Sequence, residues 1–136
     1  MTEPCAPQLY EQKQQQWTAF IKRGEILPEV RPFIAASWQR CKNYGVKQEY
    51  DTEILSETAL RELLLQNKEL LDIAHPILAK LMELVAGSQY VITLHDRNGY
   101  IIDYVFDGNY QLSQNTGFCL GAKWVEQLVG TNGAHV

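Results

Sequence analysis

The feature that most constrains the fold is an apolar repeat of helical spacing in the middle of the chain. Between Leu60 and Val85, apolar side chains recur at alternating intervals of four and three residues, and Asn67 is the polar exception. This spacing places them on one side of an α-helix, which must then pack against another surface. We therefore predict a helix with Ser56 as its N-cap. Its seam consists of Leu60, Leu64, Asn67, Leu71, Ala74, Leu78, Leu81 and Val85.

Two further predictions concern the same helix. Pro76 removes one backbone donor from its middle, so we expect a kink or a break into two helices near His75. The stripe is also longer than one short hairpin can cover, which favours a homodimer formed through these helices. Asn67 is a position that can fix the register of such packing. The candidate packing residues are Leu60, Leu64, Asn67, Leu71, Leu78 and Leu81.

Two shorter helices are predicted ahead of this repeat. The first starts near Leu9, and Gly24 and Pro28 end it. The second starts at Arg31-Pro32, because proline suits the first helical turn, and it stops at Gly45. Residues 46–55 are interpreted as a connecting loop.

The hydropathy period then changes from that of a helix to that of strands. Residues 89–96 and 100–106 are rich in β-branched and aromatic side chains. Asn98-Gly99 between them is a strong hairpin signal, because both residues tolerate positive φ. A short helix is predicted around Ala122–Leu128. Helices first and a hairpin second indicate the α+β class, with the N-terminal helices packed on an antiparallel sheet.

A lone hairpin is marginal in water and exposes unpaired backbone groups at its edges. We therefore expect the N-terminal helices to cover one of its faces, and a second copy to contribute through dimerisation.

Composition and charge bear on several functions. The 136 residues include 12 Lys+Arg and 16 Asp+Glu, a net charge of −4. Since no dense basic patch is present, direct nucleic-acid binding is not expected. No apolar run approaches the roughly 18 residues that span a bilayer, and the start lacks the features of a signal peptide. We expect a cytoplasmic protein without membrane contact.

The cysteines and histidines do not form a metal-binding pattern. Cys5, Cys41 and Cys119 lie far apart, without a CxxC motif, and the three histidines share no ligand spacing. No metal and no cofactor are therefore expected.

Aromatic residues towards the C-terminal end form the candidate ligand-binding site. Tyr104, Phe118 and Trp124 can line a pocket for a small molecule beside Cys119, and the alternative is that they belong to the core. Cys119 can also be a redox thiol, for which Lys123 supplies a nearby cation, although no resolving cysteine is close in sequence. The simpler alternative is a packed thiol.

DNA binding is an alternative function for the second helix. Ser37-Trp38-Gln39-Arg40-Cys41 lies on a basic segment and can be interpreted as a recognition helix. The interleaved Phe33 and Trp38 suit core packing better, so this remains an alternative.

Five groups of residues, in order along the chain, carry a resemblance to a known family. They are Trp17-x-x-Phe20 with Val30-Arg31-Pro32-x-Ile34-x-x-Ser37-Trp38-x-Arg40-Cys41; Asn67-x-x-Leu70-Leu71 with Ala74-x-Pro76; Val91-Ile92-Thr93-Leu94-x-Asp96-x-x-Gly99; Gly121-Ala122-x-Trp124-x-Glu126; and Gly130-Thr131-Asn132. Together they resemble the N-terminal sensory region of sigma-54-dependent transcriptional activators of the acetoin-catabolism and dihydroxyacetone-kinase-operon type.

The resemblance implies a GAF-type sensor fold and a regulatory function. On this basis residues 1–66 are a helical region, and residues 67–136 are the N-terminal half of a GAF-like domain with an incomplete sheet. It implies a non-catalytic, signal-sensing module that binds a small-molecule effector or a regulatory protein. The alternatives are a GAF-type redox enzyme that uses Cys119, similar to free methionine sulfoxide reductases, and a small DNA-binding regulator.

Overall fold

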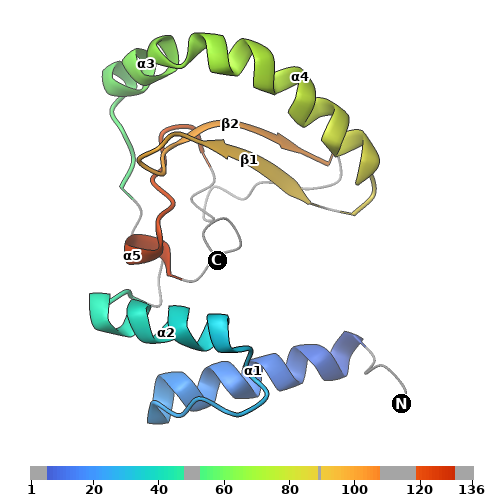
Figure 1. The fold of residues 1–136 in the computed structure, drawn as a ribbon, viewed down its shortest axis with the longest axis vertical. Helices are drawn as coiled ribbons and strands as arrows, with labels where there is room; N and C mark the ends of the chain where they lie inside the picture. The colour runs from blue at the N-terminus through green and yellow to red at the C-terminus, as the bar shows by residue number, and fades with distance from the viewer. Residues whose placement is uncertain (1–5, 48–52, 89, 108–118, 131–136) are drawn as a thin grey trace.

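Five helices and one two-stranded antiparallel sheet make up the part of the chain that the computed structural model describes, residues 6–47, 53–88, 90–107 and 119–130. The predicted α+β class is confirmed. Figure 1 shows the elements stacked along the long axis of the molecule. Helices α3 and α4 lie above the hairpin, and α5, α2 and α1 follow below it.

The two N-terminal helices form where their end signals predict them. Helix α1 spans Ala6–Arg23, so it begins three residues before the predicted start at Leu9, and α2 spans Pro32–Tyr44. Gly45 ends α2 with a φ of 71°, a left-handed conformation that glycine adopts without steric cost. The rings of Phe20 and Trp38 pack the two helices together, with their centroids 5.3 Å apart.

The long apolar repeat forms two helices, α3 (Glu57–Gln66) and α4 (Lys68–Leu84). The predicted cap is confirmed, because the Ala59 backbone N–H donates to Ser56 Oγ at 3.2 Å. Asn67 separates the two helices. Its backbone leaves helical geometry, and its side-chain amide donates to the Leu63 carbonyl oxygen at 2.9 Å.

The expected break into two helices near His75 is wrong, because α4 runs without interruption through Pro76. Proline removes one helical hydrogen bond. Contacts of the same turn with the sheet offset this loss, since His75 Nδ1 lies 2.7 Å from Asp103 Oδ2 on the second strand. The interruption lies at Asn67 instead, where φ is −102° and ψ is 15°, and the Leu63 carbonyl oxygen accepts from both its backbone N–H and its side-chain amide.

One side of α4 packs along the hairpin, as Figure 1 shows. The less exposed residues of α4 and its C-cap recur at helical spacing and are Leu71, Ala74, Leu78, Met82 and Val85. The sheet is therefore covered by α4, and not by the N-terminal helices as predicted, because α5 lies between those helices and the hairpin. The first two helices lie on the other side of α5, and α2 contacts that short helix.

The predicted hairpin consists of β1 (Val91–His95) and β2 (Ile101–Phe106), paired antiparallel with a bulge between Leu94 and His95. The turn is stabilised by Asp96, whose Oδ1 accepts the backbone N–H groups of Asn98 and Tyr100 at 3.0 and 2.8 Å. Gly99 has a φ of 87°, as the Asn-Gly signal predicts.

Residues 121–125, called the extended segment below, pair with the start of β2. Ile101 donates to the Ala122 carbonyl at 2.9 Å, and Gly121 donates back to the Ile101 carbonyl at 2.8 Å. On its other side the same segment pairs with the residues before α3, through Ile54 opposite Ala122. The predicted helix over Ala122–Leu128 is therefore wrong in its first part, and α5 spans only Glu126–Val129.

The core lies where the hairpin meets this extended segment. Ile101 and Ala122 are fully buried, and Trp124 is 6% exposed. Tyr104, Cys119, Leu120 and Val129 pack around them. These contacts fix the segment in place, and α5 follows it directly.

Gly99 provides a test of this packing. A methyl group at Gly99 would collide with Val125 Cγ1, and the residue would also have to hold a positive φ. Gly99→Ala should lower the free energy of unfolding by about 1–2 kcal/mol for the backbone and by about 1–3 kcal/mol more for the collision. Urea unfolding followed by circular dichroism measures the loss.

Gly87→Ala is the matched control, because Gly87 has a φ of 84° and nothing within 4 Å of its added Cβ. It should show the backbone cost alone. Adding Val125→Ala to Gly99→Ala should recover part of the loss. Equal losses in the Gly99 and Gly87 variants would contradict the packing described here.

Candidate functional site

A polar joint connects α2 to α5 and consists of Ser37, Arg40 and Glu126. In sequence, Glu126 lies 89 positions from Ser37 and 86 from Arg40. Arg40 donates from Nε to Glu126 Oε1 at 2.6 Å and from its Nη2 to Oε2 at 2.9 Å. Ser37 donates from Oγ to the same Oε2 at 2.7 Å. A bidentate guanidinium–carboxylate pair fixes direction as well as distance, so the joint orients one helix against the other.

The three side chains of the joint differ in their exposure to solvent. Ser37 is fully buried, and the side chain of Glu126 is 12% exposed, whereas that of Arg40 is 47% exposed. The hydrogen bond to Glu126 raises the pKa of Arg40 above its ordinary value, so the guanidinium stays charged. The carboxylate accepts from both partners, which compensates for its removal from water.

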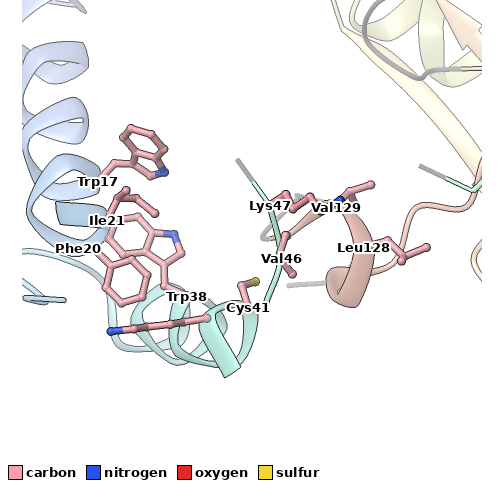
Figure 2. Close-up of a pocket in the computed structure, with 11 residues that line it drawn as sticks. Trp17, Phe20, Ile21, Trp38, Cys41, Val46, Lys47, Leu128 and Val129 are labelled. Carbon is pink, nitrogen blue, oxygen red and sulfur yellow. The ribbon is translucent and has the colours of Figure 1, made fainter. Parts of the chain in front are cut away.

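Beside this joint lies a cavity of about 410 Å³. Figure 2 shows aromatic and aliphatic side chains of α1 and α2 on one side, and side chains from the end of α2 and from α5 on the other. The lining residues are Trp17, Phe20, Ile21, Trp38, Cys41, Lys42, Val46, Lys47, Leu128, Val129 and Gly130.

The charge of the cavity differs from that of the chain as a whole. The described residues that line it include two lysines and no acidic side chain, although the net charge of the chain is −4. The ammonium of Lys42 lies 5.8 Å from the centroid of the Phe20 ring, so it sits against the aromatic wall. The cavity thus combines apolar surface with positive charge.

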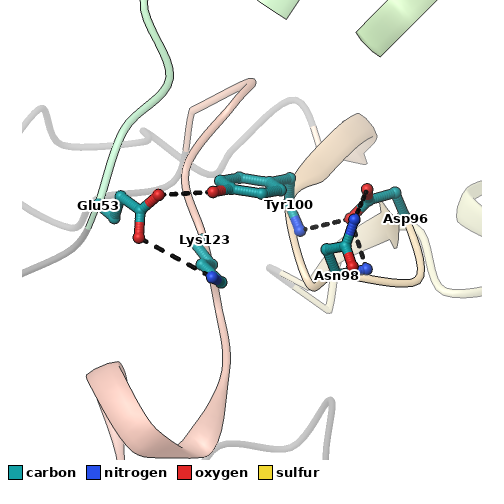
Figure 3. A network of polar contacts seen from close by, with 5 residues as sticks. All are labelled: Glu53, Asp96, Asn98, Tyr100 and Lys123. Atoms are coloured by element: carbon teal, nitrogen blue, oxygen red, sulfur yellow. Dashed lines mark hydrogen bonds and ion pairs between the residues drawn. The ribbon is translucent and has the colours of Figure 1, made fainter. Parts of the chain in front are cut away.

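A second polar network lies at the hairpin turn (Figure 3). The Tyr100 hydroxyl donates to Glu53 Oε1 at 2.6 Å, and this bond raises the pKa of Tyr100 above its ordinary value. Lys123 Nζ lies 3.8 Å from Glu53 Oε2 and 5.2 Å from the Tyr100 ring centroid. These contacts tie the residues before α3 to the turn and to the extended segment, which is a structural role.

The structure brings three of the four predicted ligand-binding residues together. Trp124 forms the buried core cluster with Ile101 and Ala122, and Tyr104 and Cys119 pack against this cluster. Phe118 lies outside the described residues. The cavity in Figure 2 is formed by other residues.

The predicted helix-packing residues lie mainly on the inner side of α3 and α4. Leu60, Leu64, Asn67 and Leu71 are half-buried and Leu78 is buried, whereas Leu81 is 44% exposed. Leu60 contacts the extended segment, since a Cβ added at Gly121 would lie 3.4 Å from Leu60 Cδ1.

No pattern in the sequence indicates that Arg40 and Glu126 meet. Both occur in the segments that carry the family resemblance, and Ser37 does as well. Their separation along the chain is too large for any spacing rule to connect them. Lys42 was also missed, because a single lysine on a helix is usually solvated.

No group of three or more His, Cys, Asp or Glu side chains in residues 6–47, 53–88, 90–107 and 119–130 is arranged to hold a metal ion. Within the same residues, no helix has the length and apolar character needed to cross a bilayer.

The fold and the site together define a small α+β module with an aromatic, positively charged cavity beside a polar joint. No protein-family model matches its sequence. No solved structure is significantly similar to it.

Two curated proteins are similar in sequence. One is a "Signal-transduction and transcriptional-control protein" of Clostridium beijerinckii, 30% identical over 103 residues that make up 74% of this chain and 16% of that protein. The other is an "Acetoin catabolism regulatory protein" of Cupriavidus necator, 33% identical over 102 residues, 72% of this chain and 15% of that protein. The chain thus spans a small part of the length of each relative.

The joint predicts energetic coupling between Arg40 and Glu126. In a double-variant cycle of Arg40→Gln and Glu126→Gln, the double variant should lose less stability than the sum of the single variants, because either change already breaks the pair. Urea unfolding of the four proteins measures the coupling.

The control is the exposed pair of Arg61 and Glu57, whose side chains are 72% and 88% exposed. Pairs of this kind contribute little, so their cycle should be close to additive. Additivity at Arg40 and Glu126 would show that the joint does not form.

Proposed function

We propose that the chain is a signal-sensing regulatory module of a bacterial sigma-54-type transcription activator, in which it binds a small metabolite or a partner protein. The observation that carries the proposal is its similarity to two regulatory proteins over 103 and 102 residues. On this proposal the chain acts in the cytoplasm, requires no cofactor and does not itself bind DNA.

The proposed division of the chain has a helical region in residues 1–66 and the first half of a GAF-like domain in residues 67–136. The division falls at Asn67, where α3 ends and α4 begins. The joint of Arg40, Ser37 and Glu126 crosses it, and so can couple a change in one region to the other. Such a coupling element is what a sensory module needs.

The alternatives receive less support from the described contacts. Cys119 is half-buried beside the apolar core cluster, and that environment suits a packed thiol. On the second helix, Ser37 is buried and Arg40 is paired with Glu126. A recognition helix would need such side chains to face DNA.

A chimeric activator tests the regulatory role. The chain replaces the matching region of the Cupriavidus necator regulator, and a reporter gene measures transcription from a promoter of that regulator. We expect regulated output that differs several-fold from the output of the same activator without the region. Arg40→Gln in the chimera should reduce this difference, because the joint would no longer couple the two regions.

Two controls give this test its specificity. Arg61→Gln alters an exposed arginine away from the joint and should leave output unchanged. Fusion of the chain to an activator that works with the main sigma factor should give no regulation. If chimeras with and without the chain give equal transcription, the proposal fails.

We also propose that the chain forms a homodimer through its long helices. The inner row of α4 packs on the hairpin, so a second row remains available. It recurs at intervals of three and four residues and consists of Leu70, Ile73, Ile77, Leu81 and Leu84, which are 45%, 67%, 53%, 44% and 82% exposed. Of the residues in the seam predicted from the sequence between Leu60 and Val85, only Leu81 belongs to this row. An apolar row of this length on one helix is suited to pairing with a second copy.

Ile77→Glu should convert the dimer to a monomer without unfolding it, because the charge falls on an exposed position. Leu71→Asp should instead lower stability by several kcal/mol, since it places a charge against the sheet. Light scattering and urea unfolding distinguish the two effects. Tyr10→Glu, at an exposed position on α1, should change neither property. A monomeric mass for the unmodified chain at every accessible concentration would refute dimerisation.

A further inference from the structure

We infer that the cavity between α1, α2 and α5 binds a small, uncharged aromatic molecule. The role of that molecule as an effector rests on the proposed function, whereas binding itself is a property of the purified chain.

The cavity has the size and the walls of a small-molecule site. Its volume of about 410 Å³ lies within the range of such sites, about 300–1,000 Å³. Trp17 and Trp38 supply flat aromatic surface on one side, and Val46 and Val129 lie on the other (Figure 2). Apolar walls on two sides suit a planar ring placed between them.

The aromatic walls favour an aromatic ligand over a saturated one. Trp17 is 44% exposed, so a large part of its indole ring is open to a ligand. Trp38 packs on Phe20 with the ring centroids 5.3 Å apart, and both residues also line the cavity. Contacts between aromatic rings add to the free energy of burying apolar area. A ligand ring against Trp17 gains such a contact, which a saturated ring cannot make.

The charges near the cavity are not placed to hold an ion inside it. The Lys42 ammonium lies beside Gly24, since a Cβ added there would be 3.0 Å from its Nζ, and Gly24 does not line the cavity. Lys47 has an interaction partner of its own. The described lining residues include no carboxylate to pair with a cation. An ion of either sign would lose hydration without a matched counter-ion, so an uncharged ligand is favoured.

The site also lies where binding can be communicated. Leu128 and Val129 of α5 line the cavity, and Glu126 at the start of the same helix forms the joint with α2. A ligand between α1–α2 and α5 therefore bears on the contact that orients the two regions.

The experiment uses three phenyl probes of similar length with the complete chain: the uncharged 4-phenyl-2-butanone, the anion 3-phenylpropionate, and the cation 3-phenylpropylammonium. Calorimetry should show saturable binding of one ketone per chain. Each ion should bind at least about tenfold more weakly, because it must lose hydration without a partner.

A fourth probe tests the aromatic walls. 4-Cyclohexyl-2-butanone has the same chain and the same carbonyl group on a saturated ring. It should bind about threefold to tenfold more weakly than the phenyl ketone, the ratio expected for lost ring contacts.

Variants locate the ring of the ligand. Trp17→Leu keeps an apolar side chain but removes one aromatic wall, so it should weaken the phenyl ketone about threefold to tenfold and bring the two ketones closer in affinity. Tyr10→Leu is the matched control, because it removes an exposed aromatic ring of the same helix that does not line the cavity. It should change neither affinity. The comparison of probes on the unmodified chain depends on neither variant.

Thiol alkylation locates the ligand without any substitution. Cys41 lines the cavity and Cys119 packs against the core cluster, and both are half-buried. The phenyl ketone should slow the alkylation of Cys41 by N-ethylmaleimide and leave the rate at Cys119 unchanged, as measured by mass spectrometry of each site.

Several results would overturn the inference: no saturation by the phenyl ketone up to about 10 mM, an ion that binds as tightly as the ketone, equal affinities for the two ketones, or protection of Cys119 in place of Cys41. An affinity that falls as protein concentration rises would mean that a second copy occupies the cavity, and this would also overturn it. Because none of these measurements uses transcription, failure here leaves the regulatory role intact, and failure of the chimera leaves the site intact.

Discussion

A two-stranded hairpin is marginal in water, and the described structure is arranged around the two surfaces that such a hairpin leaves open. One face of the hairpin is apolar, and α4 covers it with the inner row that includes Leu71 and Leu78. The edge of β2 would expose unpaired backbone groups in an isolated hairpin, and here the segment around Ala122 pairs with it. The core cluster of Ile101, Ala122 and Trp124 forms where this segment meets the hairpin.

The position of the joint follows from this arrangement. Because the extended segment is paired with β2, the chain that leaves it turns into α5 at a fixed place, with Glu126 in the first turn. The carboxylate then faces α2 and accepts from Ser37 and Arg40. A hydroxyl and a guanidinium satisfy the charge of a largely buried carboxylate better than either alone. The N-terminal helices are therefore held to the sheet layer through polar contacts.

Local signals predicted most of the elements, and long-range contacts account for what was missed. Ser56, Gly45 and Asn98-Gly99 act within a few residues of themselves, and all three formed the predicted cap, stop and turn. Pro76 predicted a kink or a break near His75, but the helix continues through it, and His75 of that turn contacts Asp103 on the hairpin. Ala122 and Lys123 have a helical pattern, yet strand-like partners distant in sequence override it. No local rule connects Arg40 to Glu126.

Composition cannot tell a filled aromatic cluster from an open one, so the sequence could not separate the predicted ligand site around Tyr104 and Trp124 from its alternative, a core cluster. Trp124 and Tyr104 pack around Ile101. There the extended segment and β2 are joined by backbone hydrogen bonds, which bring their side chains into contact. Between α2 and α5 the connection is a polar joint at one end, and the described residues of these two elements form no backbone ladder with each other. Trp17 and Trp38 therefore line an open cavity, although they are no less apolar than Trp124. Aromatic residues form a core where the backbone is paired closely around them, and a cavity where only side chains span the gap.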